Sequence, residues 1–568
     1  MKKALVYICF LIVLLSCKNF KEGVDMIIYN AKIYSVDSSF SVKEAMAIKD
    51  GKIVKTGTDE MILKEFNAKE IQNIQGKYIF PGFIDAHCHF LSYGLGLKQL
   101  DLVGTKSFNE VIERIKEFTK TNKTEWIIGR GWDQNDWAAK EYPNKKILDS
   151  LFPETPIILK RIDGHAALVN TEVLKRTGIN LNTKIDGGEL ITDTKGNLTG
   201  ILIDNAVDIV TNKMPPPSKE QLKQALLAAQ KNCFAFGLTT IDDAGLKKSE
   251  IDMIDELQKK NELKMRIYAM LSPNAENLTH YLKHGIYKTN KLTVRSFKFY
   301  ADGALGSRGA CLLNDYSDKP KWKGFLLNKK EYFEKYAELM AEKGFQLNTH
   351  CIGDSAVRLI LSIYSKYFNN HCMASKNFPK ESADKTLRWR IEHFQISTYS
   401  DLDYLQCLNS PSSSPNAPQI IPSVQSTHAT SDMYWAEKKL GKERLNLAYA
   451  YKNLLKATGM LALGTDFPVE DISPFKTFYA SVYRKDSKGF PAGGFQIENA
   501  LSREETIKGM TIWAAYANFE EKEKGSLEKN KYADFIILDT DLLNCKEDKI
   551  LQTKVLSTFI AGKEVYKK

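Results

Sequence analysis

The sequence predicts an α/β fold: a distorted (β/α)8 TIM barrel with an inserted subdomain and a small β-sandwich domain formed by both chain ends. The middle of the chain alternates short apolar segments with helical stretches, which is typical of βα units around a parallel sheet. Both flanks consist largely of short β-like segments. Eight candidate barrel strands, the number a TIM barrel needs, end near Asp85, Asp242, Leu271, Tyr300, His350, His393, Val424 and Asp466.

The first residues predict a secretory signal. Two lysines precede an apolar run at 4–15 that is too short to span a bilayer comfortably. The run leads into the residues LLSC, which resemble a bacterial lipobox. We expect a lipoprotein signal peptide at 1–16, a lipid on Cys17 and a linker at 17–24; an ordinary signal peptide and an uncleaved anchor are the alternatives. The predicted location is the bacterial cell envelope, periplasmic or surface-exposed, with the membrane contacted through the N-terminal lipid only.

The two flanks are predicted to meet in one small β domain, made of residues 25–79 and 525–568. Asp50-Gly51 between two apolar segments is a strong signal for a tight hairpin turn. Residues 533–539 and 556–566 have the same strand-like pattern. Because chain termini often lie close together in a domain, the two flanks can share a sheet.

The barrel domain is predicted to span residues 80–524. About 150 residues separate its first two candidate strands, which is more than one crossover connection requires. The sequence therefore predicts a subdomain inserted at about 95–230.

Composition limits the class of protein. A chain of 568 residues with 43% hydrophobic and 11% aromatic residues is typical of a folded protein with more than one core. The net charge of +11 is spread along the chain without a basic tail, so it predicts a solubilising surface and no nucleic-acid binding. The cysteines show no regular spacing, which argues against a disulfide framework and against a thiolate zinc site.

The stretch "PGFIDAHCHF" places His87 and His89 at the end of an apolar run. If the strand continues through both, its period of two puts the imidazoles on one face, where they suit a divalent metal. Two histidines in a polar loop are the alternative. Four further metal-compatible or charged groups occur at or near the ends of later candidate strands, where such barrels build their active sites: Lys298, His350, His393 and Asp466.

Several motifs together resemble one family. They are "PGFIDAHCHF", "KFYADGALGSRGA", "THCIGD", "RIEHF", "PSVQSTHATSD" and "ALGTDFPV", with "GRGWDQNDW" and "KRIDGHAALVN" in the inserted region. From about residue 25 to the C-terminus the chain resembles the amidohydrolase superfamily, specifically the amidohydrolase-3 group that includes N-substituted formamide deformylase-like enzymes. The motifs are specific for the family and only weakly specific for a substrate.

The resemblance implies a barrel with one or two divalent metals, usually zinc. His87 and His89 would bind the more buried metal, which Asp466 would also contact. His350 and His393 would bind the other. Lys298 would correspond to a lysine that reacts with carbon dioxide to give a bridging carbamate. In such a site Asp466 would accept the proton of the attacking water and deliver it to the leaving nitrogen.

The same motifs contain candidate substrate-binding residues. Asp163, His165 and His428 are candidates for orienting the substrate or stabilising the oxyanion of a tetrahedral intermediate. Arg161 can pair with an anionic substrate group or form a structural ion pair, and the sequence favours neither.

Three further residues have two interpretations each. Trp132 either lines the pocket from the inserted region or belongs to a core, as buried tryptophans commonly do. Asp302 and Arg308, in the glycine-rich segment after Lys298, either meet the substrate or fix that loop.

The predicted function is that of a metal-dependent amidohydrolase which cleaves a non-peptide C–N bond, in an amide, N-acyl or N-formyl group of a small molecule. Hydrolysis of an ester or cyclic amide at the same metal site is one alternative. A non-catalytic small-molecule-binding envelope lipoprotein is another. The sequence leaves the natural substrate and the oligomeric state open.

Overall fold

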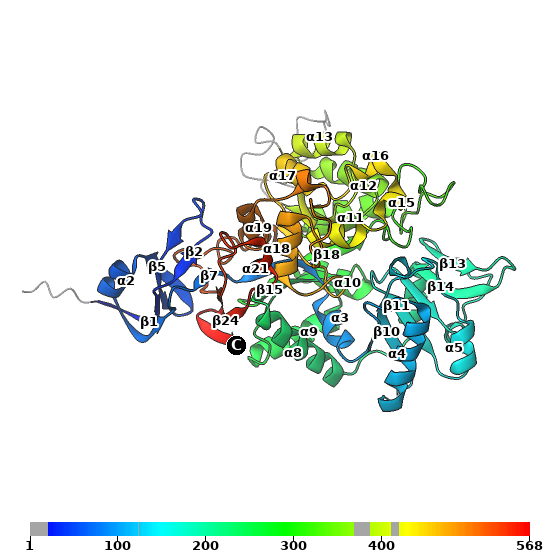
Figure 1. Cartoon of the computed structure of the whole chain (residues 1–568), viewed down its shortest axis with the longest axis horizontal. Coiled ribbons are helices and arrows are strands. Elements are labelled where there is room, and N and C mark those ends of the chain that lie inside the picture. The colour runs from blue at the N-terminus through cyan, green and yellow to red at the C-terminus, as the bar shows by residue number, and fades with distance from the viewer. Residues whose placement is uncertain (1–20, 123, 369–386, 410–419) are drawn as a thin grey trace, which may run out of the picture.

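The structure is a computed structural model that describes residues 21–122, 124–368, 387–409 and 420–568. The predicted signal peptide and the lipid-carrying Cys17 lie outside the described residues. Figure 1 shows the small β domain at one end of the molecule, the barrel in the middle and the inserted subdomain at the other end. Among the described residues, no helix combines the length and the apolar character needed to cross a membrane.

Eight parallel strands form the barrel sheet, in the order β22-β21-β20-β19-β18-β16-β15-β8. The strands are β8 (Phe83–Cys88), β15 (Leu238–Leu246), β16 (Arg266–Leu271), β18 (Leu292–Tyr300), β19 (Gln346–Cys351), β20 (Trp389–His393), β21 (Ile420–Val424) and β22 (Ala462–Leu463). Helices between them include α8 (Lys219–Ala235), α9 (Lys248–Lys259), α10 (Ala275–His284), α11 (Lys330–Lys343), α12 (Asp354–Tyr364), α13 (Tyr399–Leu408) and α17 (Tyr451–Thr458). The predicted fold class is confirmed.

The first and last barrel strands meet next to His87 and His89, the two histidines of "PGFIDAHCHF". The backbone N–H of Asp466 donates to the carbonyl of His87 at 2.8 Å, and the N–H of His89 donates to the carbonyl of Phe467, also at 2.8 Å. Gly464 makes the approach possible, because a Cβ at this position would lie 2.5 Å from the backbone nitrogen of His87. The closure of the barrel therefore brings Asp466 beside His87 and His89.

The small β domain contains two sheets. One has the order β5-β4-β1-β6, and the other has the order β25-β24-β23-β7-β2-β3. Their strands are β1 (Glu22–Tyr29), β2 (Lys32–Tyr34), β3 (Val42–Lys43), β4 (Ala45–Lys49), β5 (Lys52–Gly57), β6 (Phe66–Asn73), β7 (Tyr78–Pro81), β23 (Phe535–Leu538), β24 (Val555–Ile560) and β25 (Lys563–Lys567). β7 pairs antiparallel with β23, so the second sheet joins the two ends of the chain.

The inserted subdomain lies between β8 and β15 and has a six-stranded sheet of its own, in the order β13-β14-β12-β11-β10-β9. The strands are β9 (Leu100–Asp101), β10 (Ile127–Trp132), β11 (Ile157–Arg161), β12 (Ala166–Val169), β13 (Gly188–Thr192) and β14 (Leu198–Asp204), with helices α4 (Phe108–Thr121), α5 (Lys146–Leu151), α6 (Thr171–Thr177) and α7 (Asn205–Thr211). Apolar clusters separate from that of the barrel pack around this sheet. The inserted region is therefore a subdomain with its own sheet and apolar cores, and not a long loop.

Candidate metal centre and active site

A cavity of about 740 Å³ lies at the carboxyl ends of the barrel strands. Its barrel wall includes His89, Lys298, His350, His393, His428 and Asp466. Its other wall comes from the inserted subdomain and includes Arg130, Asp133, Arg161, Asp163 and His165. This is the end at which (β/α)8 barrels place their catalytic groups, so the cavity is the candidate active site.

Three buried side chains at the base of this site can hold a metal ion. One ligand atom each of His87, His393 and Asp466 lies within 4.8 Å of the other two. The backbone of His393 has φ 70° and that of Asp466 has φ 62°. Such positive φ values are uncommon for residues other than glycine and are concentrated at functional sites.

Three of the histidines at this site have the Nδ1 atom of the ring occupied by a hydrogen-bond acceptor. The contacts are His87 to Glu392 Oε2 at 2.5 Å, His89 to the carbonyl of Ala244 at 3.1 Å, and His393 to Gln425 Oε1 at 2.7 Å. An acceptor at Nδ1 keeps the proton on that nitrogen, which leaves Nε2 as the metal-binding atom.

The sequence prediction for His89 needs one correction. β8 ends at Cys88, and His89 (φ −122°, ψ 69°) precedes helix α3 (Phe90–Gly96), so the strand does not continue through both histidines. The two rings nevertheless face the same carboxylate, because Asp466 Oδ1 lies 3.8 Å from Nε2 of His87 and 3.3 Å from Nε2 of His89. The two imidazoles therefore approach each other because the chain turns into the helix at His89, and not because they alternate along one strand.

Lys298 and His350, the other two predicted metal ligands, lie close to these side chains. Lys298 Nζ lies 2.9 Å from Nε2 of His87, and the lysine is 1% exposed. Within the described residues, no carboxylate oxygen lies within 4.0 Å of this amine. Burial lowers the pKa of Lys298 to about 8, which increases the fraction of neutral amine. The ring centroid of His350 is 4.5 Å from that of His393.

The protonation of these groups is suited to a divalent cation. Burial and Lys298 lower the pKa of His87 to about 4, and burial lowers the pKa of His393 far below its usual value. Burial acts to raise the pKa of Asp466, but the neighbouring histidines hold it well below its usual range. Asp466 Oδ1 is buried and lacks a hydrogen-bond partner. Neutral imidazoles and an unsatisfied carboxylate oxygen are the donor set that a zinc-like ion needs.

His428 and two residues of the inserted subdomain reach the same cavity. Nε2 of His428 lies 3.5 Å from Asp466 Oδ2. Nδ1 of His165 lies 2.6 Å from Asp204 Oδ1, and the ring centroid of His165 is 5.1 Å from that of His350. Asp163 also lines the cavity. The structure therefore brings together the three residues expected to orient a substrate.

The structure separates the two interpretations of Arg161. Its guanidinium is 2% exposed and contacts Asp133 Oδ1 and Asp163 Oδ2, each at 2.5 Å. Two carboxylates already neutralise this cation, which favours the structural ion pair over pairing with an anionic substrate group.

Three predicted substrate-binding residues are not among the residues that line the cavity, and each has other contacts. Trp132 lies in the core of the inserted subdomain, where its Nε1–H donates to the carbonyl of Leu159 at 2.7 Å. Arg308 pairs with Asp318 at 2.8 Å. Asp302 accepts backbone N–H donors from Cys311, Ile352 and Gly353 at 2.8, 3.0 and 2.8 Å. These contacts fit the interpretation in which Asp302 and Arg308 fix the glycine-rich loop; Asp302 Oδ1 also lies 3.8 Å from Nε2 of His350.

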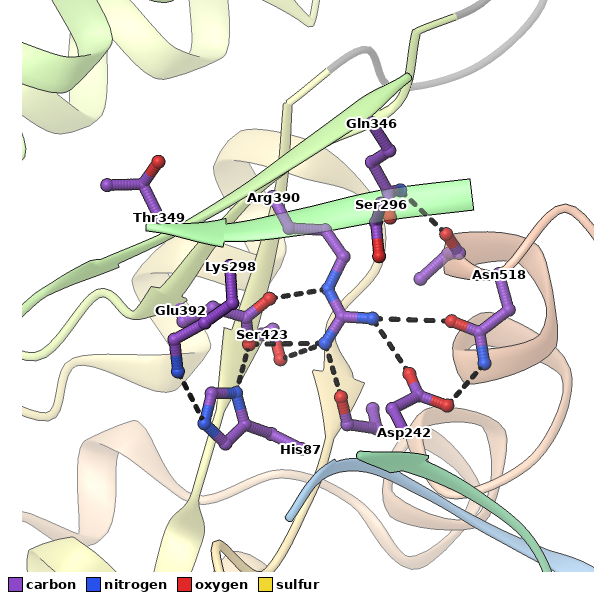
Figure 2. Close-up of polar contacts among 12 residues, drawn as sticks. His87, Asp242, Ser296, Lys298, Gln346, Thr349, Arg390, Glu392, Ser423 and Asn518 are labelled. Carbon is purple, nitrogen blue, oxygen red and sulfur yellow. Dashed lines mark hydrogen bonds and ion pairs between the residues drawn. The ribbon is translucent and has the colours of Figure 1, made fainter. Parts of the chain in front are cut away.

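Sequence reasoning missed several charged residues of the site. Glu392 contacts His87 beneath the cavity (Figure 2), while Asp432 and Glu470 line the cavity itself. The alternation in "RIEHF" could have indicated Glu392, since it places Arg390 and Glu392 on one face of a strand whose end is His393. No comparable pattern marks Asp432 or Glu470, which follow strands in helix and loop segments.

A parallel barrel with histidines, a lysine and an aspartate gathered at the carboxyl ends of its strands defines a site of the metal-dependent hydrolase class. Residues 70–566 match the family model described as "Amidohydrolase family", and the chain belongs to that family.

Three similar proteins illustrate the likeness. The chain is 31% identical over 560 residues to Protein LONG AFTER FAR-RED 3 of Arabidopsis thaliana, covering 95% of this chain and 91% of that protein. It is 22% identical over 557 residues to N-substituted formamide deformylase of Arthrobacter pascens, covering 95% and 97%. The crystal structure of an uncharacterized metal-dependent hydrolase from Pyrococcus horikoshii OT3 superimposes with a TM-score of 0.73 at 26% identity, covering 92% of this chain and 99% of that one. Family and structural likeness together support a metal-dependent hydrolase.

Proposed function

We propose that this protein hydrolyses a non-peptide C–N bond, in an amide, N-acyl or N-formyl group of a small molecule, at a centre of one or two zinc ions. The observation that carries the proposal is the convergence of His87, His393 and Asp466 at the base of the cavity. The likeness to a formamide deformylase supports the choice of a C–N bond.

The donor set divides into two groups. His87, His89 and Asp466 would hold the more buried ion, His350 and His393 would hold the second, and Lys298 would be a ligand of both. Bound zinc lowers the pKa of water towards 7 and polarises a carbonyl oxygen. Lys298 fits a ligand role after reaction of its neutral amine with carbon dioxide, because the carbamate supplies the anionic oxygen that a free ammonium cannot.

Other side chains would transfer the proton, bind the oxyanion and orient the substrate. Asp466 accepts the proton of the attacking water and returns it to the leaving nitrogen, a transfer that suits a carboxylate at the base of the cavity. His428, 3.5 Å from that carboxylate, is placed to bind the oxyanion that forms at the carbonyl. His165 and Asp163 orient the substrate from the opposite wall.

A panel of small substrates tests the reaction class. The full-length protein, purified in detergent and reconstituted with zinc and bicarbonate, is assayed on N-formyl and N-acyl amides, esters and cyclic amides. Turnover of the open-chain amides, with loss in Asp466→Asn, supports the proposal. Turnover confined to esters or cyclic amides replaces it with the corresponding alternative. Metal binding without turnover of any member favours a non-catalytic binding protein.

The envelope location is a separate part of the proposal. A lipid on Cys17 would anchor the protein in the envelope, as the lipobox-like residues LLSC predict. Free thiols at Cys88, Cys233, Cys311, Cys351 and Cys545 show that disulfides are not a general framework here. Metabolic labelling with a radioactive fatty acid should mark the parent and not Cys17→Ser; equal labelling of both would exclude the lipid anchor.

A further inference from the structure

A chain of buried charges runs beneath the candidate metal centre (Figure 2). Arg390 Nη1 contacts Asp242 Oδ2 at 2.8 Å, and Arg390 Nε contacts Glu392 Oε1 at 2.7 Å. The other oxygen of Glu392 accepts the hydrogen bond from Nδ1 of His87 at 2.5 Å. All four side chains are fully buried.

This arrangement is unusual for the interior of a barrel. TIM barrels are commonly filled by layers of bulky aliphatic side chains, and a buried ion pair often contributes no more stability than apolar residues of the same volume. Packing alone therefore does not explain why this interior carries Asp242, Arg390 and Glu392. Their common feature is a continuous path of contacts that ends at His87.

The contacts fix both the ring and the backbone of this histidine. The hydrogen bond to Glu392 keeps the proton on Nδ1, so Nε2 faces Lys298 Nζ at 2.9 Å and Asp466 Oδ1 at 3.8 Å. Arg390 also donates to the carbonyl of Ala86, the residue before His87. The charged network thus holds His87 at two points.

Figure 2 shows that the network continues to Asn518. Asn518, which follows helix α20 (Ile512–Ala517), donates from Nδ2 to Asp242 Oδ1 at 2.6 Å. Its Oδ1 accepts from Arg390 Nη1 at 3.3 Å. Both carboxylate oxygens of Asp242 are therefore held, and Asp242 in turn orients Arg390.

We propose that Glu392, Arg390 and Asp242 are positioning residues for the metal ligand His87, acting as a relay that presents Nε2 of His87 to the metal. The proposal rests on the proposed metal centre and extends it, because Asp242 and Arg390 touch neither the cavity nor the ion. It gives these residues a role in metal affinity that is distinct from their contribution to folding.

The affinity for zinc tests the relay without any need for a substrate. The dissociation constant is measured by competition with a chromophoric chelator on the full-length protein in detergent, per mole of folded protein. Glu392→Gln should weaken zinc binding by about 10- to 100-fold, the usual cost of losing the partner of a ligating histidine. Asp242→Asn is isosteric, and Asp242 is three contacts from His87 along this path. It should weaken zinc binding by a smaller factor, about 3- to 10-fold. This second variant keeps the test decisive if Glu392→Gln does not fold.

A second buried ion pair supplies the matched control. Arg266 and Asp534 are joined at 2.5 and 2.9 Å and are 2% and 5% exposed, but they have no contact with His87. Asp534→Asn should lower the thermal midpoint and leave the zinc dissociation constant unchanged. Equal losses of zinc affinity in Asp534→Asn and Asp242→Asn would overturn the relay, since general loosening of the fold would then explain both.

The decisive comparison repeats Glu392→Gln in a His87→Ala background. If the relay acts through His87, the effect of Glu392→Gln on residual metal affinity should disappear once His87 is absent. The visible spectrum of the cobalt-substituted protein should likewise change in Glu392→Gln and not in Asp534→Asn. An undiminished effect of Glu392→Gln without His87 would overturn the relay while leaving the metal centre intact. Absence of zinc binding by the parent would overturn the metal centre and the relay together.

Discussion

The barrel and the inserted subdomain each contain a buried arginine between two carboxylates, but the two clusters are built differently. In the barrel, Arg390 lies between Asp242 and Glu392, and all three side chains are fully buried. In the inserted subdomain, Arg161 lies between Asp133 and Asp163, whose side chains are 14% and 13% exposed. The first cluster is sealed and leads to a metal ligand, whereas the second forms part of the cavity surface. In the proposed function, the barrel carries the chemistry and the inserted subdomain shapes the space for the substrate.

The largest expected effect is on turnover and belongs to the barrel wall. In the proposed mechanism Asp466→Asn removes the proton acceptor, so kcat should fall by about 10²- to 10⁴-fold on any substrate that the panel identifies. Steady-state kinetics on folded, zinc-loaded protein provide the measurement. A variant that keeps more than half of the parent kcat would assign the proton transfer to another group.

The next effect distinguishes the two arginine clusters by stability. Arg390→Met leaves two carboxylates buried without a cation, and should lower the free energy of unfolding by about 3–5 kcal/mol. Urea unfolding of the metal-free protein, followed by circular dichroism, provides the measurement. A loss below 1 kcal/mol would show that water or rearrangement already compensates these charges.

The corresponding change in the inserted subdomain should cost less. Arg161→Met leaves Asp133 and Asp163 at a surface that water reaches through the cavity, so the loss should be about 1–3 kcal/mol. It should also raise KM more than it lowers kcat, because the cavity wall loses its shape while the metal ligands stay in place. A fall in kcat with unchanged KM would move Arg161 from the substrate wall to the catalytic machinery.

The last prediction concerns pH dependence and a carboxylate that has no arginine. Within the described part of the chain, Asp432 has hydrogen bonds from Tyr449 and Gln395 but no ion pair with lysine or arginine, and burial raises its pKa to about 7. A raised pKa means that the folded state binds the proton more tightly than the unfolded state does. The stability that this carboxyl contributes to the protein is therefore lost as pH rises from about 4 to 7. In Asp432→Asn that loss should be absent. Urea midpoints of parent and variant at pH 4.5, 6 and 8 test this, and parallel midpoints across the range would contradict it.

The barrel could be predicted from the sequence because each of its strands is marked by a pattern within a short segment of the chain. Apolar runs of strand length end in polar groups, and the observed strands end within a few residues of the predicted positions; His350, for example, is followed by only one more residue of β19. The groups at the strand ends then had to converge, because a closed parallel barrel brings the carboxyl ends of its strands together.

The contacts that the sequence did not reveal are long-range. Glu392 and His87 are 305 residues apart, and nothing in either motif specifies that one oxygen of Glu392 meets Nδ1 of His87. The roles of Trp132 and Arg308 were equally out of reach, since each depends on whether the neighbouring chain covers the side chain or leaves it open to the cavity. Residue type and spacing predicted the groups that converge at the candidate metal centre, but not the contacts that support them.

The most direct test of the central claim is the metal content of the full-length protein in detergent, measured by plasma mass spectrometry for the parent and for His87→Ala. We expect one or two zinc equivalents in the parent and a clear loss in the variant, with both proteins folded by circular dichroism. No bound metal in the parent, even after reconstitution with zinc and bicarbonate, would contradict the account.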